Sequence, residues 1–268
     1  LKDVIRLSSE KKKIIFIDEL SWMDTQKSDL MVALENFWNG FASARKDIVL
    51  IVCASATSWM LSKVVHNKGG LYNRLTEQIH LLRECEAYVK AAGLALNRNQ
   101  ILQYYMIFGG VPYYWGFLKK GLSLSQNIDS ILFEKDAPLR DEFKYLYASV
   151  FKKPENYVKI IEALGTKKVG MTREEIITAT KIPNSGDLTT KLEELESCGF
   201  IRKYNAFGMK KKNAIYQLMD CFTLFYFKFL KSEQTDEHFW TNQINTPAVN
   251  TWLGLAFERV CMEHVDQI

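Results

Sequence analysis

The chain has 268 residues, of which 47% are apolar, and this is ordinary for a globular protein with two or three small domains. Its 35 basic and 31 acidic residues leave a net charge of +4, too even a balance to indicate a nucleic-acid or membrane partner. The uncharged, largely apolar run over residues 48–62 is too short to span a bilayer. Five scattered cysteines without Cys-x-x-Cys spacing are typical of reduced thiols, so we expect a cytoplasmic protein.

The first chemical pattern is Lys-Ile-Ile-Phe-Ile-Asp-Glu, residues 13–19. Apolar residues followed by two acids predict a buried parallel strand with paired carboxylates at its carboxyl end. In the Walker B arrangement of P-loop NTPases, the first acid holds Mg²⁺ and the second orients the attacking water. Asp18 is therefore a candidate Mg²⁺ ligand acting through water, and Glu19 is a candidate catalytic residue. The alternative is that both acids merely begin a loop.

A helix is predicted next, over about residues 25–44, because its apolar positions recur at helical spacing. The apolar run Ile48–Ala54 then predicts a second strand, which we expect, like the first, to be buried on both faces. Strand, helix and strand in this order favour a parallel sheet covered by helices. The first 85 residues are accordingly predicted to be α/β, forming part of a P-loop NTPase sheet.

Polar residues follow the second predicted strand. In AAA-like ATPases, a polar residue at the tip of this strand hydrogen-bonds the attacking water or the γ-phosphate, and Ser55 is the better candidate here, with Thr57 the lesser. The alternative for Ser55 is a helix N-cap. Arg74 follows Gly69-Gly70 and is a candidate for stabilising charge on the transferring phosphoryl group, in cis or across a subunit interface. A lone surface arginine is the alternative.

The rest of the chain is predicted to be mostly helical. Residues 86–150 form an all-helical lid, broken at 108–112 by two glycines and a proline. Residues 151–220 read as a winged helix-turn-helix, with three helices and a two-stranded hairpin. The expected elements are helix 157–164, a capping box at 172–175 that opens a helix to 180, helix 187–198, and strands 200–204 and 214–218. The aromatic run 222–229 is expected to be a core helix.

A winged helix raises the possibility of DNA binding. Residues 151–215 contain thirteen Lys or Arg against eight Asp or Glu, and Lys210, Lys211 and Lys212 are candidate DNA contacts in the wing. The helix that would enter the groove is acidic, however, since Glu193, Glu194 and Glu196 would meet phosphates unfavourably. A structural or partner-docking winged helix is therefore preferred, and a DNA-binding regulator on a degenerate ATPase scaffold is the alternative function.

Taken together, these segments resemble a family of prokaryotic AAA-type ATPases of the STAND kind. Such proteins join an ATPase core and helical lid to a winged helix and a C-terminal restriction-nuclease-like domain. The matching segments, in order, are residues 14–23, 53–60, 67–74, 109–112, 216–229 and 254–258. The resemblance implies ATP and Mg²⁺ as cofactors and an ATP-driven switch that couples nucleotide state to the winged helix and an effector domain. Self-association or a protein partner is also expected.

The resemblance has two departures. The family usually has glycine where this chain has Ala54, which leaves Ser55 plausible. No Gly-x-x-x-x-Gly-Lys-Ser/Thr run occurs in the twelve residues before the first strand, where a P-loop would lie upstream. We therefore expect an internal fragment that does not hydrolyse ATP itself. Its parent protein is expected to supply a P-loop before Leu1 and, after Ile268, a nuclease-like domain that residues 221–268 begin, with Glu258 as an accessory acid.

Overall fold

The structure divides into two compact units, Leu1–Gln78 and Ile79–Ile268. It is a computed structural model that describes residues 1–25, 28–54, 60, 63–64, 69–71, 74, 76, 85–205, 214–232 and 235–264. Both units contain helices and a small sheet, so the chain is of mixed α/β class. The finer domain boundaries at residues 86, 151 and 221 stay predictions.

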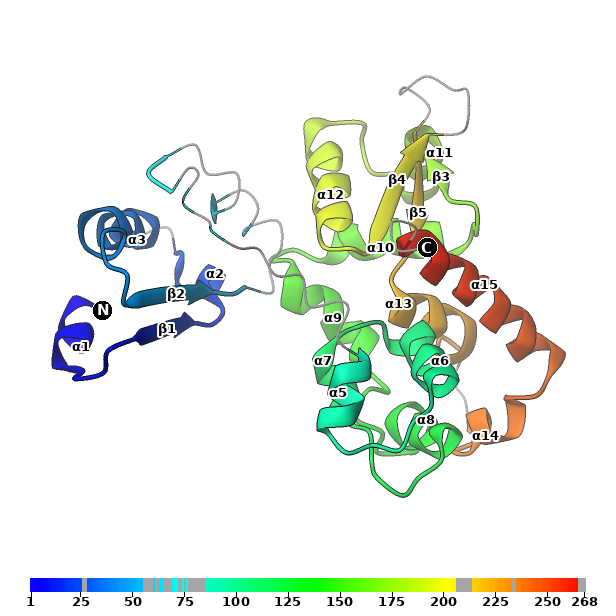
Figure 1. Ribbon diagram of the computed structural model, residues 1–268. Helices are drawn as coiled ribbons and strands as arrows, with labels where there is room; N and C mark the ends of the chain where they lie inside the picture. The colour runs from blue at the N-terminus through cyan, green and yellow to red at the C-terminus, as the bar shows by residue number, and fades with distance from the viewer. Residues whose placement is uncertain are drawn as a thin grey trace. The chain divides into compact units, whose positions relative to one another are not determined.

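The first unit is built on two parallel strands, as the strand–helix–strand pattern predicts. β1 (Lys13–Ile17) pairs with β2 (Ile48–Val52), and Ile17 lies opposite Val52. In Figure 1, α3 lies to one side of this strand pair. The helices of the unit are α1 (Lys2–Leu7), α2 (Leu20–Met23), α3 (Leu30–Phe37) and the π-helix η1 (Trp38–Ala42).

Only one face of the two strands is covered, which corrects the expectation that both strands are buried on both faces. Because side chains alternate along a strand, the parallel register gathers one set against the helices and the other set on the opposite face. Residues of the covered face pack with Leu34, Phe37 and Trp38. The four apolar residues of the other face are 71%, 59%, 49% and 42% exposed, namely Ile14, Phe16, Val49 and Ile51. None of the described residues of this unit covers them.

The helix predicted over residues 25–44 begins later and changes its winding. α3 starts at Leu30, and from Trp38 the backbone continues as a five-residue π-helix. A π-turn adds a residue to the turn and so shifts which side chains face the sheet. Phe37 and Ala42 are buried on either side of this shift, together with Ile48 of β2. Apolar spacing alone could not place that change.

The second unit begins with five helices. Gly109, at φ 61°, ends α6, and Pro112 opens α7, so the predicted break at 108–112 is confirmed. The indole of Trp115 closes the break, because its Nε1–H donates to the Gly109 carbonyl at 2.8 Å. The helices are α5 (Cys85–Ala91), α6 (Arg98–Phe108), α7 (Pro112–Trp115), α8 (Leu124–Leu132) and α9 (Glu142–Val150).

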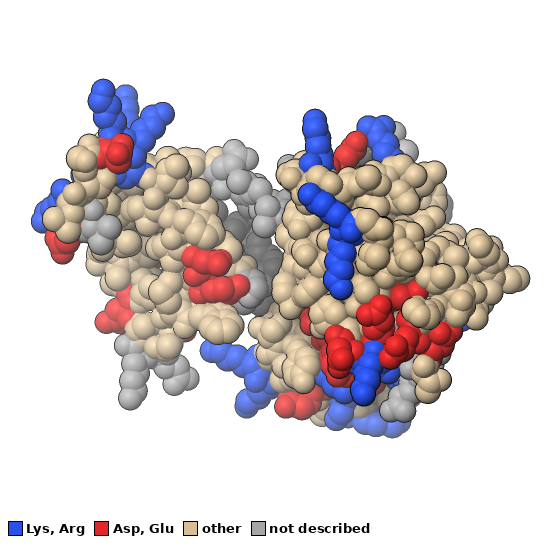
Figure 2. Space-filling model, turned by 90° about the horizontal axis from the view of Figure 1, so that it is seen from below, with Lys and Arg blue, Asp and Glu red and all other residues tan. Residues whose placement is uncertain are grey.

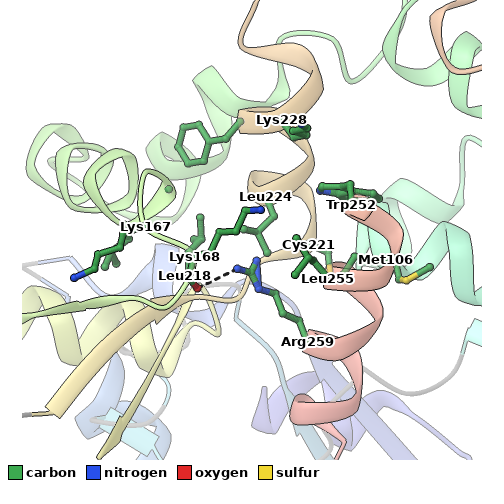
Figure 3. Close-up of a pocket in the computed structure, with 14 residues that line it drawn as sticks. Met106, Lys167, Lys168, Leu218, Cys221, Leu224, Lys228, Trp252, Leu255 and Arg259 are labelled. Carbon is green, nitrogen blue, oxygen red and sulfur yellow. Dashed lines mark hydrogen bonds between the residues drawn. The ribbon is translucent and has the colours of Figure 1, made fainter. Parts of the chain in front are cut away.

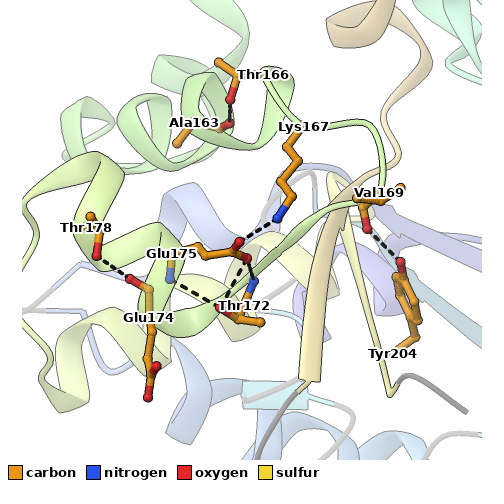
Figure 4. Close-up of polar contacts among 9 residues, drawn as sticks. All are labelled: Ala163, Thr166, Lys167, Val169, Thr172, Glu174, Glu175, Thr178 and Tyr204. Atoms are coloured by element: carbon orange, nitrogen blue, oxygen red, sulfur yellow. Dashed lines mark hydrogen bonds and ion pairs between the residues drawn. The ribbon is translucent and has the colours of Figure 1, made fainter.

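Three helices and a three-stranded antiparallel sheet follow. The predicted hairpin is confirmed, and a two-residue strand that sequence patterning missed pairs with its second arm, giving the order β3-β5-β4. The predicted capping box is also present: the Glu175 N–H donates to Thr172 Oγ1 at 3.3 Å, and the Thr172 N–H donates to the Glu175 carboxylate at 2.8 Å (Figure 4). The elements are α10 (Glu155–Gly165), β3 (Met171–Thr172), α11 (Arg173–Thr180), α12 (Gly186–Ser197), β4 (Ile201–Asn205) and β5 (Ala214–Leu218).

The aromatic run after Asp220 lies in the core of the second unit, as predicted. It forms α13 (Cys221–Phe225) and continues as the π-helix η4 (Tyr226–Leu230). Phe222, Phe225 and Phe229 are all buried. The same cluster of buried side chains includes members from α5–α9, from the sheet and its helices, and from α14 (Phe239–Gln243) and α15 (Pro247–Glu263).

A buried carboxylate ties α14 to α8. Asp129 is 1% exposed and accepts hydrogen bonds from the backbone N–H of Trp240 at 2.7 Å and of Thr241 at 3.1 Å. The Thr241 hydroxyl donates a third at 2.5 Å. A buried charge is tolerated when it is hydrogen-bonded in this way, and here the donors lie at a helix N-terminus.

The one-sided burial of β1 can be tested with two identical substitutions on neighbouring residues. Ile15→Thr places a hydroxyl on the covered face and should destabilise the first unit by about 1–3 kcal/mol. Ile14→Thr changes a side chain that is 71% exposed, and its effect should stay within about 0.5 kcal/mol. Amide hydrogen exchange of the β1 and β2 residues measures both. Equal losses would mean that the Ile14 face is covered in solution.

Candidate functional site

The two predicted acids lie at the carboxyl edge of the parallel pair. Asp18 and Glu19 follow β1 directly, and Cys53 follows β2 at the same edge. The chain segments leaving the two strands are tied together, since the Cys53 N–H donates to Ile17 O at 3.0 Å and the Leu20 N–H donates to Cys53 O at 2.9 Å. This edge is where open α/β sheets bind their ligands.

Glu19 adopts a conformation that is unusual for its residue type. Its φ of 47° and ψ of 46° place it in the left-handed region, where non-glycine residues are uncommon. The next residue, Leu20, is fully buried and begins α2, so the turn at Glu19 lets the chain leave the strand and enter the core at once. Strained backbone of this kind clusters at functional sites, at a cost of about 1–3 kcal/mol.

Cys53 is a neighbour of the site that sequence reasoning missed. Its thiol donates to Asp18 Oδ1 at 2.8 Å, and the Glu19 N–H donates to the same oxygen at 3.0 Å. The hydrogen bond to the Asp18 carboxylate favours the protonated thiol and raises the pKa of Cys53, and partial burial acts in the same direction. The signal was present in the sequence, because Cys53 follows the second strand just as Asp18 follows the first.

The donor set at this edge fits a hydrated Mg²⁺ better than a directly ligated metal. No group of three or more His, Cys, Asp and Glu side chains within the described part of the chain is placed to hold a metal ion. Mg²⁺ usually keeps several waters and takes only one or two carboxylates. Both of the hydrogen bonds that Asp18 makes with described residues end on Oδ1, so its Oδ2 can accept from a water of the cation.

Arg74 is exposed and lines a cavity of about 90 Å³ in the first unit, together with residues of α3, η1 and β2. Neither Asp18 nor Glu19 is among the described residues that line this cavity. Its described lining consists of Leu34, Trp38, Leu50, Val52, Val64, Leu71, Arg74 and Thr76.

The remaining candidate site residues are not part of the edge formed by Asp18, Glu19 and Cys53 as the structure describes it. Ser55, Thr57 and the three wing lysines, Lys210, Lys211 and Lys212, lie outside the described residues. Glu258 is described and lies exposed on α15.

The described charges do not form a basic surface on α12. Asp187, Glu193 and Glu196 are exposed there, and Lys191 is paired with Asp187 at 2.5 Å. The face seen in Figure 2 carries both acidic and basic side chains, and uncharged residues occupy most of it. In the described part of the chain, no helix is both long enough and apolar enough to cross a membrane.

No protein-family model matches the chain, and no curated protein matches it. Among solved structures, a Walker-type ATPase of Pyrococcus abyssi is similar, with a TM-score of 0.47 and 13% sequence identity, over 81% of this chain and 63% of that one. The chain thus spans less than two thirds of that protein.

The contact between Asp18 and Cys53 predicts how the reactivity of the Cys53 thiol changes when the Asp18 carboxylate is removed. Asp18→Asn removes the charge that favours the protonated thiol, so the pKa of Cys53 should fall and its thiolate fraction at pH 8 should rise. Peptide mass spectrometry should then show Cys53 alkylated by iodoacetamide severalfold faster, with Cys198 and Cys261 as internal references. The control Asp3→Asn removes an exposed carboxylate elsewhere in the unit and should leave the rate unchanged. An unaltered Cys53 rate in Asp18→Asn would contradict the contact.

Proposed function

We propose that this chain is part of a P-loop ATPase that works as a nucleotide-dependent switch. The observation that supports it most is the pair Asp18 and Glu19 at the carboxyl edge of two parallel strands, with Glu19 in a left-handed turn. An acid pair at that edge suits phosphoryl transfer, in which one carboxylate holds Mg²⁺ and the other acts on water. ATP with Mg²⁺ would supply the phosphoryl group and its charge neutralisation.

Each candidate site residue has a separate role in this proposal. Asp18 holds the water shell of the cation through Oδ2, while its Oδ1 stays fixed by the Glu19 N–H and the Cys53 thiol. Glu19 accepts a proton from the attacking water. Ser55 hydrogen-bonds the γ-phosphate or that water. Arg74 lines a cavity whose described lining includes neither acid, and we assign it to a neighbouring subunit's nucleotide, which requires self-association.

The second unit would transmit the nucleotide state. The chain order α10, β3, α11, α12, β4, β5 and the sheet order β3-β5-β4 are those expected of a winged helix. The aromatic α13–η4 segment packs in the same core as the α5–α9 helices, which supports their moving as one body. We propose that this body changes position with ATP binding and acts on an effector domain.

DNA binding is the weaker alternative. A recognition helix needs a surface that tolerates phosphates, and the exposed residues of α12 include Asp187, Glu193 and Glu196. The wing lysines that would grip a backbone lie outside the described residues. No observation in the described part of the chain favours base recognition.

The catalytic proposal predicts the effect of Glu19→Gln in a polypeptide that joins this chain to its phosphate-binding loop. ATP binding should persist, because the amide keeps the shape of the side chain. Hydrolysis should fall by about two orders of magnitude or more, because the general base is lost. Phosphate release measures turnover, and fluorescent-nucleotide titration measures binding.

The matched control is Glu10→Gln, which neutralises an exposed acid of the same unit. It should leave both hydrolysis and binding unchanged. Unaltered turnover in Glu19→Gln would remove Glu19 from the mechanism. The 268-residue chain without a phosphate-binding loop should not hydrolyse ATP at all.

A further inference from the structure

A second cavity lies within the second unit, and none of the residues given a catalytic role above lines it. It has a volume of about 150 Å³ and lies where the end of α10, the α13–η4 segment and α15 meet (Figure 3). Its apolar walls come from all three segments, including Leu164, Leu224, Trp252 and Leu255. A cavity that several elements build jointly keeps its shape only when the unit is folded.

The cavity is lined by four bases and, among its described lining residues, by no acid. The bases are Lys167, Lys168, Lys228 and Arg259. Lys167 is already engaged, because its ammonium bonds Glu175 at 2.5 Å, and in Figure 3 it points away from Arg259. The other three form no ion pair with any described residue.

Arg259 is the most constrained of these bases. It is half-buried, and its guanidinium donates a long hydrogen bond, 3.4 Å, to the Lys168 carbonyl. Burial lowers the pKa of Arg259 most, and the nearby Arg202 acts in the same direction, while Cys221 and Glu258 act in the opposite one. Cys221 supplies no counter-charge, because burial raises the pKa of its thiol and keeps it neutral. A partly desolvated cation of this kind is stabilised when an anion binds beside it.

The size of the cavity limits what its apolar part can accept. An engineered protein cavity of about 150 Å³ lined by Leu, Ile and Phe binds benzene, so a single aromatic ring is the matching volume. Trp252 offers its ring as one wall, and aromatic pairs prefer offset or edge-to-face contacts.

The geometry points to a binding site for a small aromatic anion, in which the ring occupies the apolar walls and a carboxylate or phosphate bonds Arg259, Lys168 and Lys228. An anion that lacks a ring would leave the apolar walls without a packing partner. A ring that lacks an anionic group would leave Arg259 without a bound counter-charge. The site is independent of the ATPase proposal, since it uses no residue of the first unit.

Calorimetric titration of the 268-residue chain at low ionic strength tests this site with defined probes. 3-Phenylpropionate and 2-phenylethyl phosphate should both bind, and the tighter of the two identifies the preferred anion. The neutral 3-phenylpropanamide should bind at least about tenfold more weakly, and so should acetate, because each lacks one half of the ligand.

Variants distinguish binding of 3-phenylpropionate in this cavity from nonspecific attraction of the anion to basic residues on the surface. Lys228→Met removes an exposed cation but keeps its stem, and Arg259→Gln removes the half-buried one; each should weaken 3-phenylpropionate binding about tenfold. The control Lys231→Met removes a base of the same segment that pairs with Glu162 and does not line the cavity, and it should have no effect. Equal affinity for 3-phenylpropionate and 3-phenylpropanamide would overturn the proposal. An equal loss of 3-phenylpropionate affinity in Lys231→Met and Lys228→Met would also overturn it. Failure of both anions to bind would do the same, and neither result bears on Glu19.

Discussion

The parallel register of β1 and β2 is the constraint on which the candidate catalytic edge depends. Ile17 opposite Val52 brings Asp18 beside Cys53, and the backbone bonds that cross between the two strand ends hold both turns. A shift of one residue would turn Ile15 outward and Phe16 under α3, and would separate the acid from the thiol. The covered face thus fixes the register, and the register fixes the chemistry at the edge.

The same register leaves an apolar face open. Ile14, Phe16, Val49 and Ile51 share that face, and their combined exposure is unusual for neighbouring large side chains. Burial on one face anchors the strands, while the other face gives no packing energy from the described residues. The first unit is therefore held by two apolar clusters, in which buried residues of α1, α2, α3 and η1 pack with the covered face of the strands.

In the second unit, the aromatic segment α13–η4 has the corresponding role. Phe225 contacts Phe133, Trp240 and Trp252 with ring centroids 5.2 to 6.2 Å apart, so residues far apart in the chain meet around one side chain. Segments that the sequence suggests as separate domains consequently share one core. The cationic cavity is a product of this convergence, because its bases come from α15, η4 and the loop after α10.

The sequence by itself determined the local elements, because they follow from short-range rules. Capping at Thr172, the break at Gly109 and the hairpin β4–β5 need only neighbouring residues, and the Asp18–Glu19 pair at a strand end is equally local. What only the tertiary structure decided depends on distant partners: the open face of β1, the π-turn at Trp38 and the Asp18–Cys53 contact. A continuous apolar strand looks the same in sequence whether one face or both are covered, since the covering layer lies elsewhere in the chain.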